Sequence, residues 1–277
     1  MRRTVTFTSD FGYRDTYIAE VRGVIEACAP AAHVIDLTHG IDQGDLLACS
    51  FVLMSSYGYF EEGAVHLAVV DPGVGTDRGI LAVESEGYTF VGPDNGILYE
   101  AAKRAGIKRI VAVDVARLRA QAGKLFLSPV VERVLKDGPS STFHGRDIFA
   151  PLTGYIAAGA PLEAVGSVTS SMEKVEITGP DVREGQIIGM VIYVDRFGNL
   201  ITNVSNGLVK PDDEVFIKIG GKLEGVGKIR KAYAEVLPER CLPVTGSRGY
   251  VEIARNGGSA KEHLGAHTGD EILVLRG

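Results

Sequence analysis

The chain of 277 residues changes its apolar pattern after about residue 170, and this change limits the possible architectures more than any other feature. Before it, short apolar runs typical of strands alternate with stretches of helical periodicity. After it, short strand-like runs are separated by glycines, and no long helical periodicity remains. The sequence therefore predicts two domains, residues 1–175 and residues 183–277, with the polar stretch EKVEITGPDVREGQ as a linker.

The first domain shows the alternation of strands and helices that is typical of α/β proteins. Strands are expected at residues 4–9, 33–37, 64–70, 80–83, 88–91 and 109–113, and helices after Asp15, after Asp45 and at residues 98–105. The run at residues 64–70 is continuously apolar, as expected for a strand that is covered on both faces. We therefore expect a mostly parallel sheet flanked by helices.

The second domain contains short strand-like runs such as GMVIYV, EVFIKI, GYVEIA and DEILVL. Glycines and polar residues separate these runs at short intervals. This pattern predicts a small β-barrel or sandwich.

Composition and charge exclude several classes of protein. With 29 basic and 35 acidic side chains, the formal net charge is −6, so a nucleic-acid-binding face is not expected. No apolar run reaches the ~20 residues that span a bilayer, and MRRTVTFTSDFG lacks the apolar core of a signal peptide. The scattered Cys28, Cys49 and Cys241 are expected to be reduced thiols. We therefore expect a cytoplasmic protein that binds neither nucleic acids nor membranes.

The stretch VVDPGVGTDRG, residues 69–79, has the glycines of a phosphate-binding loop but contains no lysine. Asp71 and Asp77 would repel a phosphate, so a Walker-type loop is excluded. Arg78 returns seven residues after Asp71, close enough to pair with this carboxylate and keep it ionised. The loop is therefore either a catalytic loop for a cationic ligand or a surface ion pair that brackets a turn.

Two further polar segments contain candidate site residues, one directly after the first expected strand and one directly before an expected helix. TSDFGYRD places Asp10 and Asp15 at the carboxyl end of the first strand, where ligands of open α/β sheets bind; Asp15 could instead cap the next helix. STFHGRDIFAP places His144 in a turn before a helix, either as a water-activating base or as a helix-entry residue. No zinc-ligand spacing and no GxSxG nucleophile motif are present, so we expect no metal site.

The second domain offers a candidate slot for a nucleobase. Asn199 can read donor and acceptor positions of a base, while Phe197, Tyr233 and Tyr250 could stack on it. Each aromatic residue alone is better explained as part of a core, so only the set, with the neighbouring glycines, indicates a binding site.

Taken together, these segments resemble the S-adenosyl-L-methionine (SAM) hydroxide adenosyltransferase family, which is related to fluorinating and chlorinating enzymes of the same fold. The stretches that carry the resemblance are TSDFG, VVDPGVGTDR, GPDNG, SSTFHGRDIFAP, DRFGNLITN and GSRGYVEIARNGGSA. They occur in the family's order along the full chain.

The resemblance implies an α/β domain followed by a β-barrel, and a homotrimer whose active sites lie between the N-terminal domain of one subunit and the C-terminal domain of its neighbour. It implies catalytic roles for Asp71, Arg78 and His144, and a ribose contact for Asp10. The implied adenine and methionine contacts are Asp195, Phe197, Asn199, Tyr233, Ser247, Arg248, Glu252, Arg255 and Gly257.

The implied reaction is attack of water at C5′ of SAM, with a preference for the R epimer, to give adenosine and methionine. A sulfonium leaves as a neutral thioether, so no metal or cofactor is expected. We assign Asp71 to orient the water, His144 to accept or relay its proton, and Arg78 to keep the carboxylate charged.

Three alternatives to the hydrolase remain. A halogenase would need a halide beside C5′, but a carboxylate ~4 Å away would cost it roughly 4 kcal/mol at an effective dielectric near 20. A non-catalytic adenosine- or SAM-binding module would need the aromatic slot but not the set formed by Asp71, Arg78 and His144. A metal-dependent phosphohydrolase lacks the ligand spacings.

Overall fold

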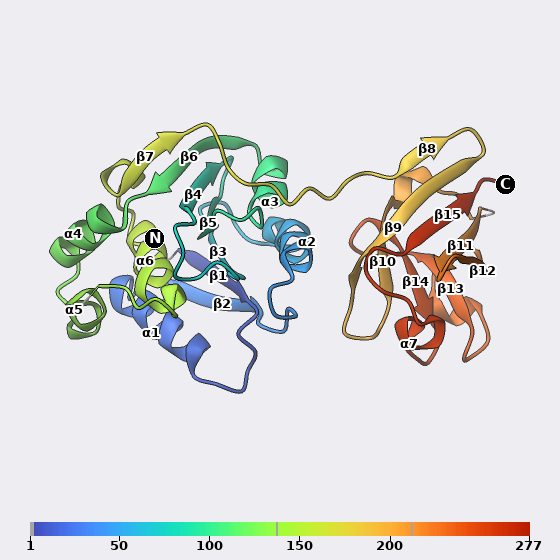
Figure 1. The fold of residues 1–277 in the computed structure, drawn as a ribbon, viewed down its shortest axis with the longest axis horizontal. Coiled ribbons are helices and arrows are strands. Elements are labelled where there is room, and N and C mark those ends of the chain that lie inside the picture. The colour runs from blue at the N-terminus through green and yellow to red at the C-terminus, as the bar shows by residue number, and fades with distance from the viewer. Residues whose placement is uncertain (1–2, 137, 212) are drawn as a thin grey trace. The chain divides into compact units, whose positions relative to one another are not determined.

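A computed structural model of the chain describes residues 3–136, 138–211 and 213–277 (Figure 1). It contains two compact units, Met1–Glu176 and Ile177–Gly277.

The first unit is built on a seven-stranded sheet in the order β2-β1-β3-β5-β4-β6-β7. The strands are β1 Thr4–Ser9, β2 His33–Thr38, β3 Val65–Val69, β4 Ile80–Ser85, β5 Thr89–Pro93, β6 Ile107–Val113 and β7 Gly166–Thr169. β1 pairs with β2 and β3, and β3 pairs with β5, in parallel; the other three pairings are antiparallel. The sheet is therefore mixed, and the prediction of a mostly parallel sheet was wrong. The tight hairpin between β4 and β5, where Ser85 N donates to Tyr88 O, makes that pairing antiparallel.

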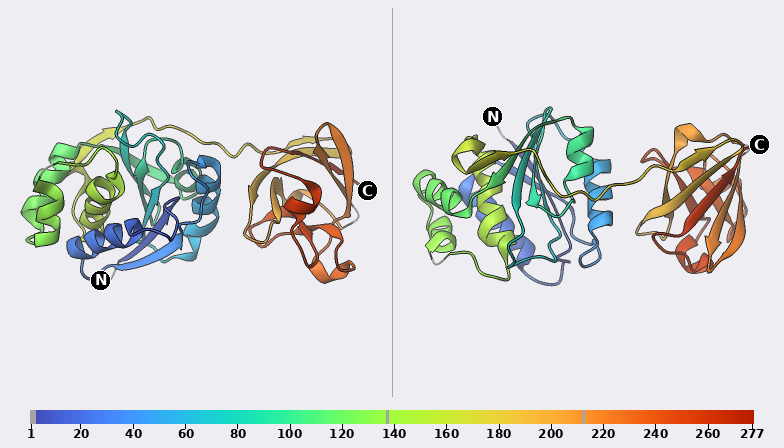
Figure 2. Two further views of the ribbon diagram at one scale, coloured as in Figure 1. Left: turned by 60° about the horizontal axis from the view of Figure 1, so that its bottom comes forward. Right: turned by 45° about the horizontal axis from the view of Figure 1, so that its top comes forward.

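Helices cover both faces of this sheet (Figures 1 and 2). One face carries α2 and α3; the other carries α1, α4, α5 and α6. The helices are α1 Tyr17–Cys28, α2 Leu46–Ser56, α3 Tyr99–Arg104, α4 Val115–Leu125, α5 Pro129–Lys136 and α6 Ala150–Ala157. A π-helical turn, Gly145–Phe149, precedes α6. Because the sheet is covered on both faces, β3 is buried throughout, as predicted for its continuous apolar run.

The parallel strands β1 and β3 bring two predicted site segments to one edge of the sheet. Their register pairs Ser9 with Val69, so the residues that follow the two strands emerge side by side. Asp10 follows β1 directly, and Asp71 lies two residues beyond β3. The sheet therefore places both carboxylates at its carboxyl edge, the usual ligand-binding edge of such sheets.

The second unit is an antiparallel, barrel-like sheet in the order β12-β11-β15-β9-β10-β14-β13, with β8 paired to β9. The strands are β8 Asp181–Arg183, β9 Gln186–Val194, β10 Leu200–Ser205, β11 Glu214–Ile219, β12 Lys222–Lys228, β13 Cys241–Thr245, β14 Tyr250–Arg255 and β15 Glu271–Leu275. Arg230, just beyond β12, bridges to Val244 of β13 and nearly closes the sheet on itself. A short helix, α7, spans Ala260–Leu264.

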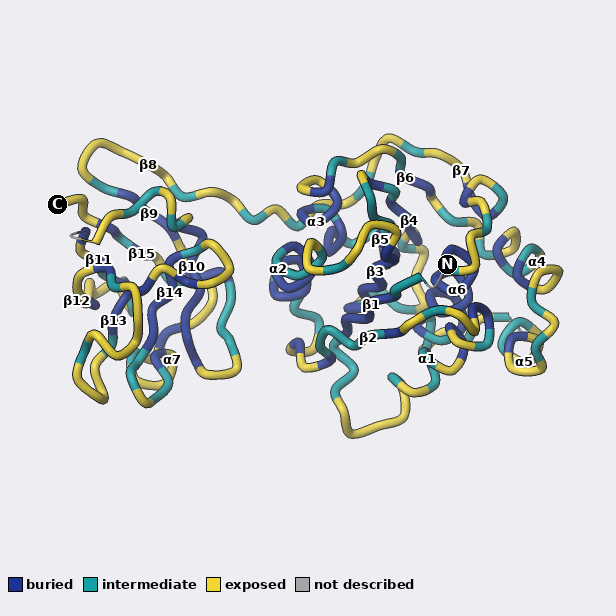
Figure 3. The backbone as a smooth tube through the Cα atoms, turned by 180° about the vertical axis from the view of Figure 1, so that it is seen from behind, coloured by how far each residue is buried: buried dark blue, intermediate teal, exposed yellow. Residues whose placement is uncertain are grey.

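The inward-facing positions of this sheet form a separate apolar core, which includes Ile187, Val191, Leu200, Val251 and Ile272. Buried residues follow most strands of both units, apart from the exposed β8 and β12, and exposed residues are concentrated in the connections (Figure 3). Among the described residues, no helix combines the length and the apolar character that crossing a membrane requires.

The polar stretch expected to be a linker is only partly irregular. Its residues Asp181–Arg183 form β8, which pairs with β9 through a turn at Gly185, φ +74°. The polar character of β8 follows from its position, because all three of its residues are exposed.

Candidate active site

The loop that follows β3 forms an ion pair within itself. Arg78 donates from Nε to Asp71 Oδ1 at 2.7 Å and from Nη2 to Asp71 Oδ2, so the guanidinium holds the carboxylate with two parallel hydrogen bonds. The two side chains are 10% and 6% exposed. The pair is therefore not a solvated surface ion pair, the alternative considered from the sequence.

The same loop packs against the segment that carries His144. Gly75 has φ +79°, and a Cβ atom there would lie 2.4 Å from the carbonyl oxygen of Ser141. Only glycine tolerates both the conformation and this close approach. The contact brings the two segments together, and Arg78 Nη2 lies 2.9 Å from His144 Nδ1.

This contact fixes the form of the His144 ring. A guanidinium only donates hydrogen bonds, so Nδ1 of His144 accepts and its proton lies on Nε2. Burial and the charge of Arg78 lower the pKa of His144, against the opposite effect of Asp71 and Asp147. The structure therefore favours a neutral ring that donates from Nε2, which does not fit the role of proton acceptor or relay assigned from the sequence.

A cavity of about 650 Å³ lies beside this set in the first unit. Asp10, Asp71 and His144 all line it. Asp10 Oδ2 also accepts from Gly44 N at 3.0 Å, which fixes its carboxylate at the rim. A negatively charged wall of this kind suits a cationic ligand with free hydroxyl groups.

Asp15 does not join this cavity. It is exposed, and α1 begins at Tyr17 with Thr16 at the N-cap. Asp15 therefore neither lines the site, as predicted for a substrate contact, nor caps the helix. The bend of the chain at residues 13–16 delays the helix by a residue.

Several lining residues were missed by the sequence analysis: Phe11, Tyr17, Gln43, Gly44, Val74 and Phe143. Phe11 and Phe143 lie within the quoted motifs, and their rings are 5.8 Å apart in an edge-on contact. Gln43 and Gly44 lie in a loop without a recognisable motif. Only the tertiary fold brings that loop to the cavity.

The second unit has its own cavity, of about 800 Å³. The lining includes all of the contacts that the resemblance implied for this domain: Asp195, Phe197, Asn199, Tyr233, Ser247, Arg248, Glu252, Arg255 and Gly257. Phe197 is 76% exposed, so its ring is available for stacking rather than used in the core, the alternative considered for single aromatics. The structure thus brings these residues together around one space, whereas Tyr250, which was also expected to stack on the base, is not among the residues that line it.

Hydrogen bonds preorganise this second cavity. Asp195 Oδ1 accepts from the backbone N of Phe197 and of Asn199, both at 2.9 Å, and Oδ2 accepts from Asn199 Nδ2 at 2.9 Å. Glu252 is buried and accepts from Tyr233 Oη at 3.3 Å. Burial raises the pKa of Glu252, and the charge of Asp195 raises it further.

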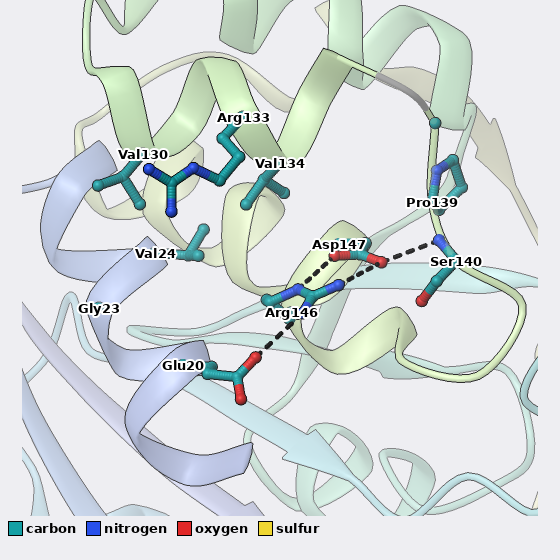
Figure 4. A pocket seen from close by; sticks show the side chains of 11 residues that line it. Glu20, Gly23, Val24, Val130, Arg133, Val134, Pro139, Ser140, Arg146 and Asp147 are labelled. Atoms are coloured by element: carbon teal, nitrogen blue, oxygen red, sulfur yellow. Dashed lines mark hydrogen bonds and ion pairs between the residues drawn. The ribbon is translucent and has the colours of Figure 1, made fainter. Parts of the chain in front are cut away.

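A third cavity, of about 660 Å³, is lined by residues of α1, of α5 and of the segment 138–147 (Figure 4). Here Arg146 donates to Asp147 Oδ1 at 2.7 Å and to Glu20 Oε2 at 3.0 Å, while Ser140 N donates to Asp147 Oδ2 at 2.8 Å. Burial alone would raise the pKa of Asp147, but the hydrogen bonds from Arg146 and Ser140 lower it. This network ties the turn after His144 to α1.

An α/β unit followed by a barrel-like unit, each with a polar cavity, defines a two-domain class of small-molecule-binding protein. The chain belongs to the SAM hydroxide adenosyltransferase family: the family's N-terminal domain matches residues 5–166 and its C-terminal domain matches residues 189–273.

Individual relatives agree with this assignment. The chain is 35% identical to the (R)-S-adenosyl-L-methionine hydrolase of Thermus thermophilus, over 99% of this chain and 100% of that protein. It is 36% identical to the enzyme of the same name from Salinispora tropica, over 99% of this chain and 98% of that protein. A crystal structure of an uncharacterized conserved protein from Thermotoga maritima superposes with a TM-score of 0.86 at 34% identity, covering 98% of this chain and 100% of that one. The fluorinase of Nocardia brasiliensis is 25% identical, over 100% of this chain and 98% of that protein.

Proposed function

We propose that the chain hydrolyses S-adenosyl-L-methionine, with a preference for the R epimer, to adenosine and L-methionine. The observation that carries this proposal is the buried Asp71 carboxylate, held by Arg78 on the wall of a cavity that Asp10 also lines. The relatives of known name at 35% and 36% identity are (R)-S-adenosyl-L-methionine hydrolases, which supports the same substrate and reaction.

In the proposed reaction, the oxygen of a water molecule forms a bond to C5′ of the ribose while the C5′–sulfur bond breaks. Its electron pair stays on sulfur, so methionine leaves as a neutral thioether and needs neither an acid nor a metal. The attacking water loses one proton, which passes by way of Asp71 to solvent. Asp71 accepts a hydrogen bond from the water and sets its direction, because each carboxylate oxygen keeps a lone pair beside its bond to Arg78.

His144 contributes a donor rather than a base in this proposal. Its Nε2–H would hold the water oxygen or a ribose oxygen in place, while Asp10 accepts from the ribose hydroxyls. Holding the water in line with the C5′–sulfur bond can supply about 7–11 kcal/mol of the barrier. A general base would add roughly 10²–10⁴-fold, so positioning is the larger contribution.

The cavity of the second unit would hold the adenine and the methionine part of the substrate. Phe197 offers a ring for stacking, Asn199 lies beside it, and Arg248 can bind the methionine carboxylate. We propose that the chain acts as a homotrimer, in which this cavity meets the Asp71 site of a neighbouring subunit. This arrangement follows from the resemblance to the family.

A halogenase is the second candidate, because fluorinases match over the full chain. The identity to them is lower, 25% against 35% and 36%. Asp71 is 6% exposed and would lie close to a bound halide, which opposes the binding of an anion. Water is therefore the favoured nucleophile.

Incubation with mixed SAM epimers in oxygen-18 water tests the proposal. We expect the label at the 5′-hydroxyl of adenosine and depletion of the R epimer, with no 5′-halo product when chloride or fluoride is added. Asp71→Ala should lose adenosine production but still bind adenosine. Tight binding without turnover by the unsubstituted chain would instead support a binding module.

A further inference from the structure

The turn GPDNG, residues 92–96, contributes no side chain to the cavity linings described above, although it lies beside the catalytic loop. Asn95 Nδ2 donates to the carbonyl oxygen of Val70 at 2.8 Å. Val70 is fully buried and directly precedes Asp71. The amide of Asn95 therefore fixes the point at which the loop begins.

The same turn holds the other end of the loop. The backbone N of Asp94 donates to the carbonyl oxygen of Gly79 at 2.9 Å, and Gly79 directly follows Arg78. The contact is close, because a Cβ atom added to Gly79 would lie 3.0 Å from Cβ of Asp94. Two adjacent residues of one turn thus grip both ends of the segment between Asp71 and Arg78.

Further hydrogen bonds fix the side chains of Asn95 and Asp94 themselves. Asn95 Oδ1 accepts from Ile97 N at 3.4 Å, which turns its Nδ2 toward Val70. Asp94 Oδ1 accepts from Glu173 N at 2.7 Å, which ties the turn to the end of the first unit. Neither side chain can rotate without losing a bond to the backbone.

We propose that Asn95 and Asp94 are positioning residues, which set the distance and direction of Asp71 and Arg78 by clamping both ends of their loop. This inference rests on the proposed function. The loop needs such a clamp because it includes Gly73 and Gly75, which restrict the backbone least. A displacement of about 1 Å at a catalytic group can cost ~10²-fold in rate.

Asn95→Asp tests the clamp, because it keeps the shape of the side chain but replaces the donor with a carboxylate that faces a carbonyl oxygen. Near pH 8 we expect kcat to fall by ~10²-fold, with the affinity for adenosine unchanged. Protonation restores an O–H donor, so the ratio of variant to wild-type kcat should rise as the pH falls toward about 5. A role in stability alone would not produce this rise.

Asn203→Asp is the matched control. Asn203 Oδ1 accepts from Met190 N and its Nδ2 donates to Thr178 O, both at 2.8 Å, so the same substitution breaks the same kind of bond in the other unit. It should lower the melting temperature but leave kcat and its pH dependence as in the wild type. Gly79→Ala strains the other end of the clamp without removing a bond, and it should also lower kcat with little change in adenosine affinity.

The outcomes separate two kinds of failure. If the wild-type chain releases no adenosine from SAM, the proposed function fails. If it does so, and folded Asn95→Asp and Gly79→Ala both keep wild-type kcat, or Asn95→Asp stays equally impaired at every pH, the clamp is refuted. Should Asn95→Asp not fold, the result for Gly79→Ala decides.

Discussion

At His144, the hydrogen-bond partner of Nδ1 determines which ring nitrogen carries the proton. The residue itself was predicted from its polar turn and from the resemblance, but the tautomer depends on Arg78, which lies 66 positions earlier in the chain. The guanidinium also lies 5.1 Å from the centre of the Phe149 ring, which further fixes its plane. Sequence patterns can indicate such residues, whereas their protonation depends on contacts that only the fold creates.

His144→Gln separates a donor from a base. Glutamine can donate from a position close to Nε2 but cannot accept a proton, so a donor role predicts that kcat stays within about tenfold of wild type. A base role predicts a loss of roughly 10²–10⁴-fold. His144→Ala, which removes the donor as well, should lose activity in either case.

The pH dependence of kcat/KM gives an independent measure of the same role. Burial and the Arg78 charge lower the pKa of His144, so the neutral ring persists below the ordinary value of 6.5. Protonation at Nδ1 would set an N–H against the guanidinium and break the contact. We therefore expect activity to be retained from pH 8 to below 6.5 and to fall only at more acidic pH. A midpoint above 6.5 would contradict this.

At the scale of elements, local patterns predicted most strands and helices, and the long-range pairing decided the rest. A helix was predicted to begin after Asp45, and the Asp45 side chain accepts from Ala48 N at 2.9 Å at the start of α2. Helices α4 and α5 were not foreseen, and neither was the π-helical turn Gly145–Phe149. The antiparallel half of the first sheet could not be read from apolar periodicity, because parallel and antiparallel strands show the same buried runs.

A buried histidine on strand β3 leads to a prediction about how the free energy of unfolding depends on pH. His66 on β3 is fully buried, its Nδ1 lies 2.7 Å from Thr6 Oγ1 on β1, and burial lowers its pKa from 6.5 to about 4. In the unfolded chain, the His66 ring therefore becomes protonated below about pH 6.5, whereas in the folded protein it stays neutral down to about pH 4. As the pH falls from 6.5 to about 4, this difference in proton binding lowers the free energy of unfolding by roughly 3 kcal/mol in total.

Replacing both partners, Thr6→Val with His66→Leu, removes the titrating group without leaving one half of the hydrogen bond unpaired. Urea unfolding of this variant should show a smaller loss of unfolding free energy between pH 7 and pH 4.5 than the wild type. Parallel losses in the two proteins would show that His66 does not control acid stability.

At the scale of the whole molecule, the change of pattern near residue 170 predicted an α/β unit followed by a β unit. The motifs and the resemblance together predicted part of the lining of each cavity, including Asp10, Asp71 and His144 in the first. The nine second-domain contacts came from the resemblance, and they line one cavity because β10, β14 and their loops meet there. What the chain alone cannot supply is the assembly. The side chains proposed as catalytic line a cavity of the first unit, and the aromatic residues proposed to stack on the adenine line a cavity of the second, so the proposed function requires the two cavities to share one substrate.

Complementation between inactive variants tests this sharing. Asp71→Ala removes the carboxylate that is proposed to orient the water, while Arg248→Ala removes the proposed contact for the methionine carboxylate. If each active site combines the first unit of one subunit with the second unit of its neighbour, trimers assembled from an equal mixture contain intact sites. Random assortment makes about one quarter of the sites intact, because each must draw its first unit from the Arg248→Ala chain and its second from the Asp71→Ala chain. Co-refolding the two variants should therefore restore about a quarter of the wild-type rate of adenosine release, whereas sites built within single subunits would give no recovery. Light scattering on the same mixture should give the mass of a trimer, and a monomer would overturn the shared site.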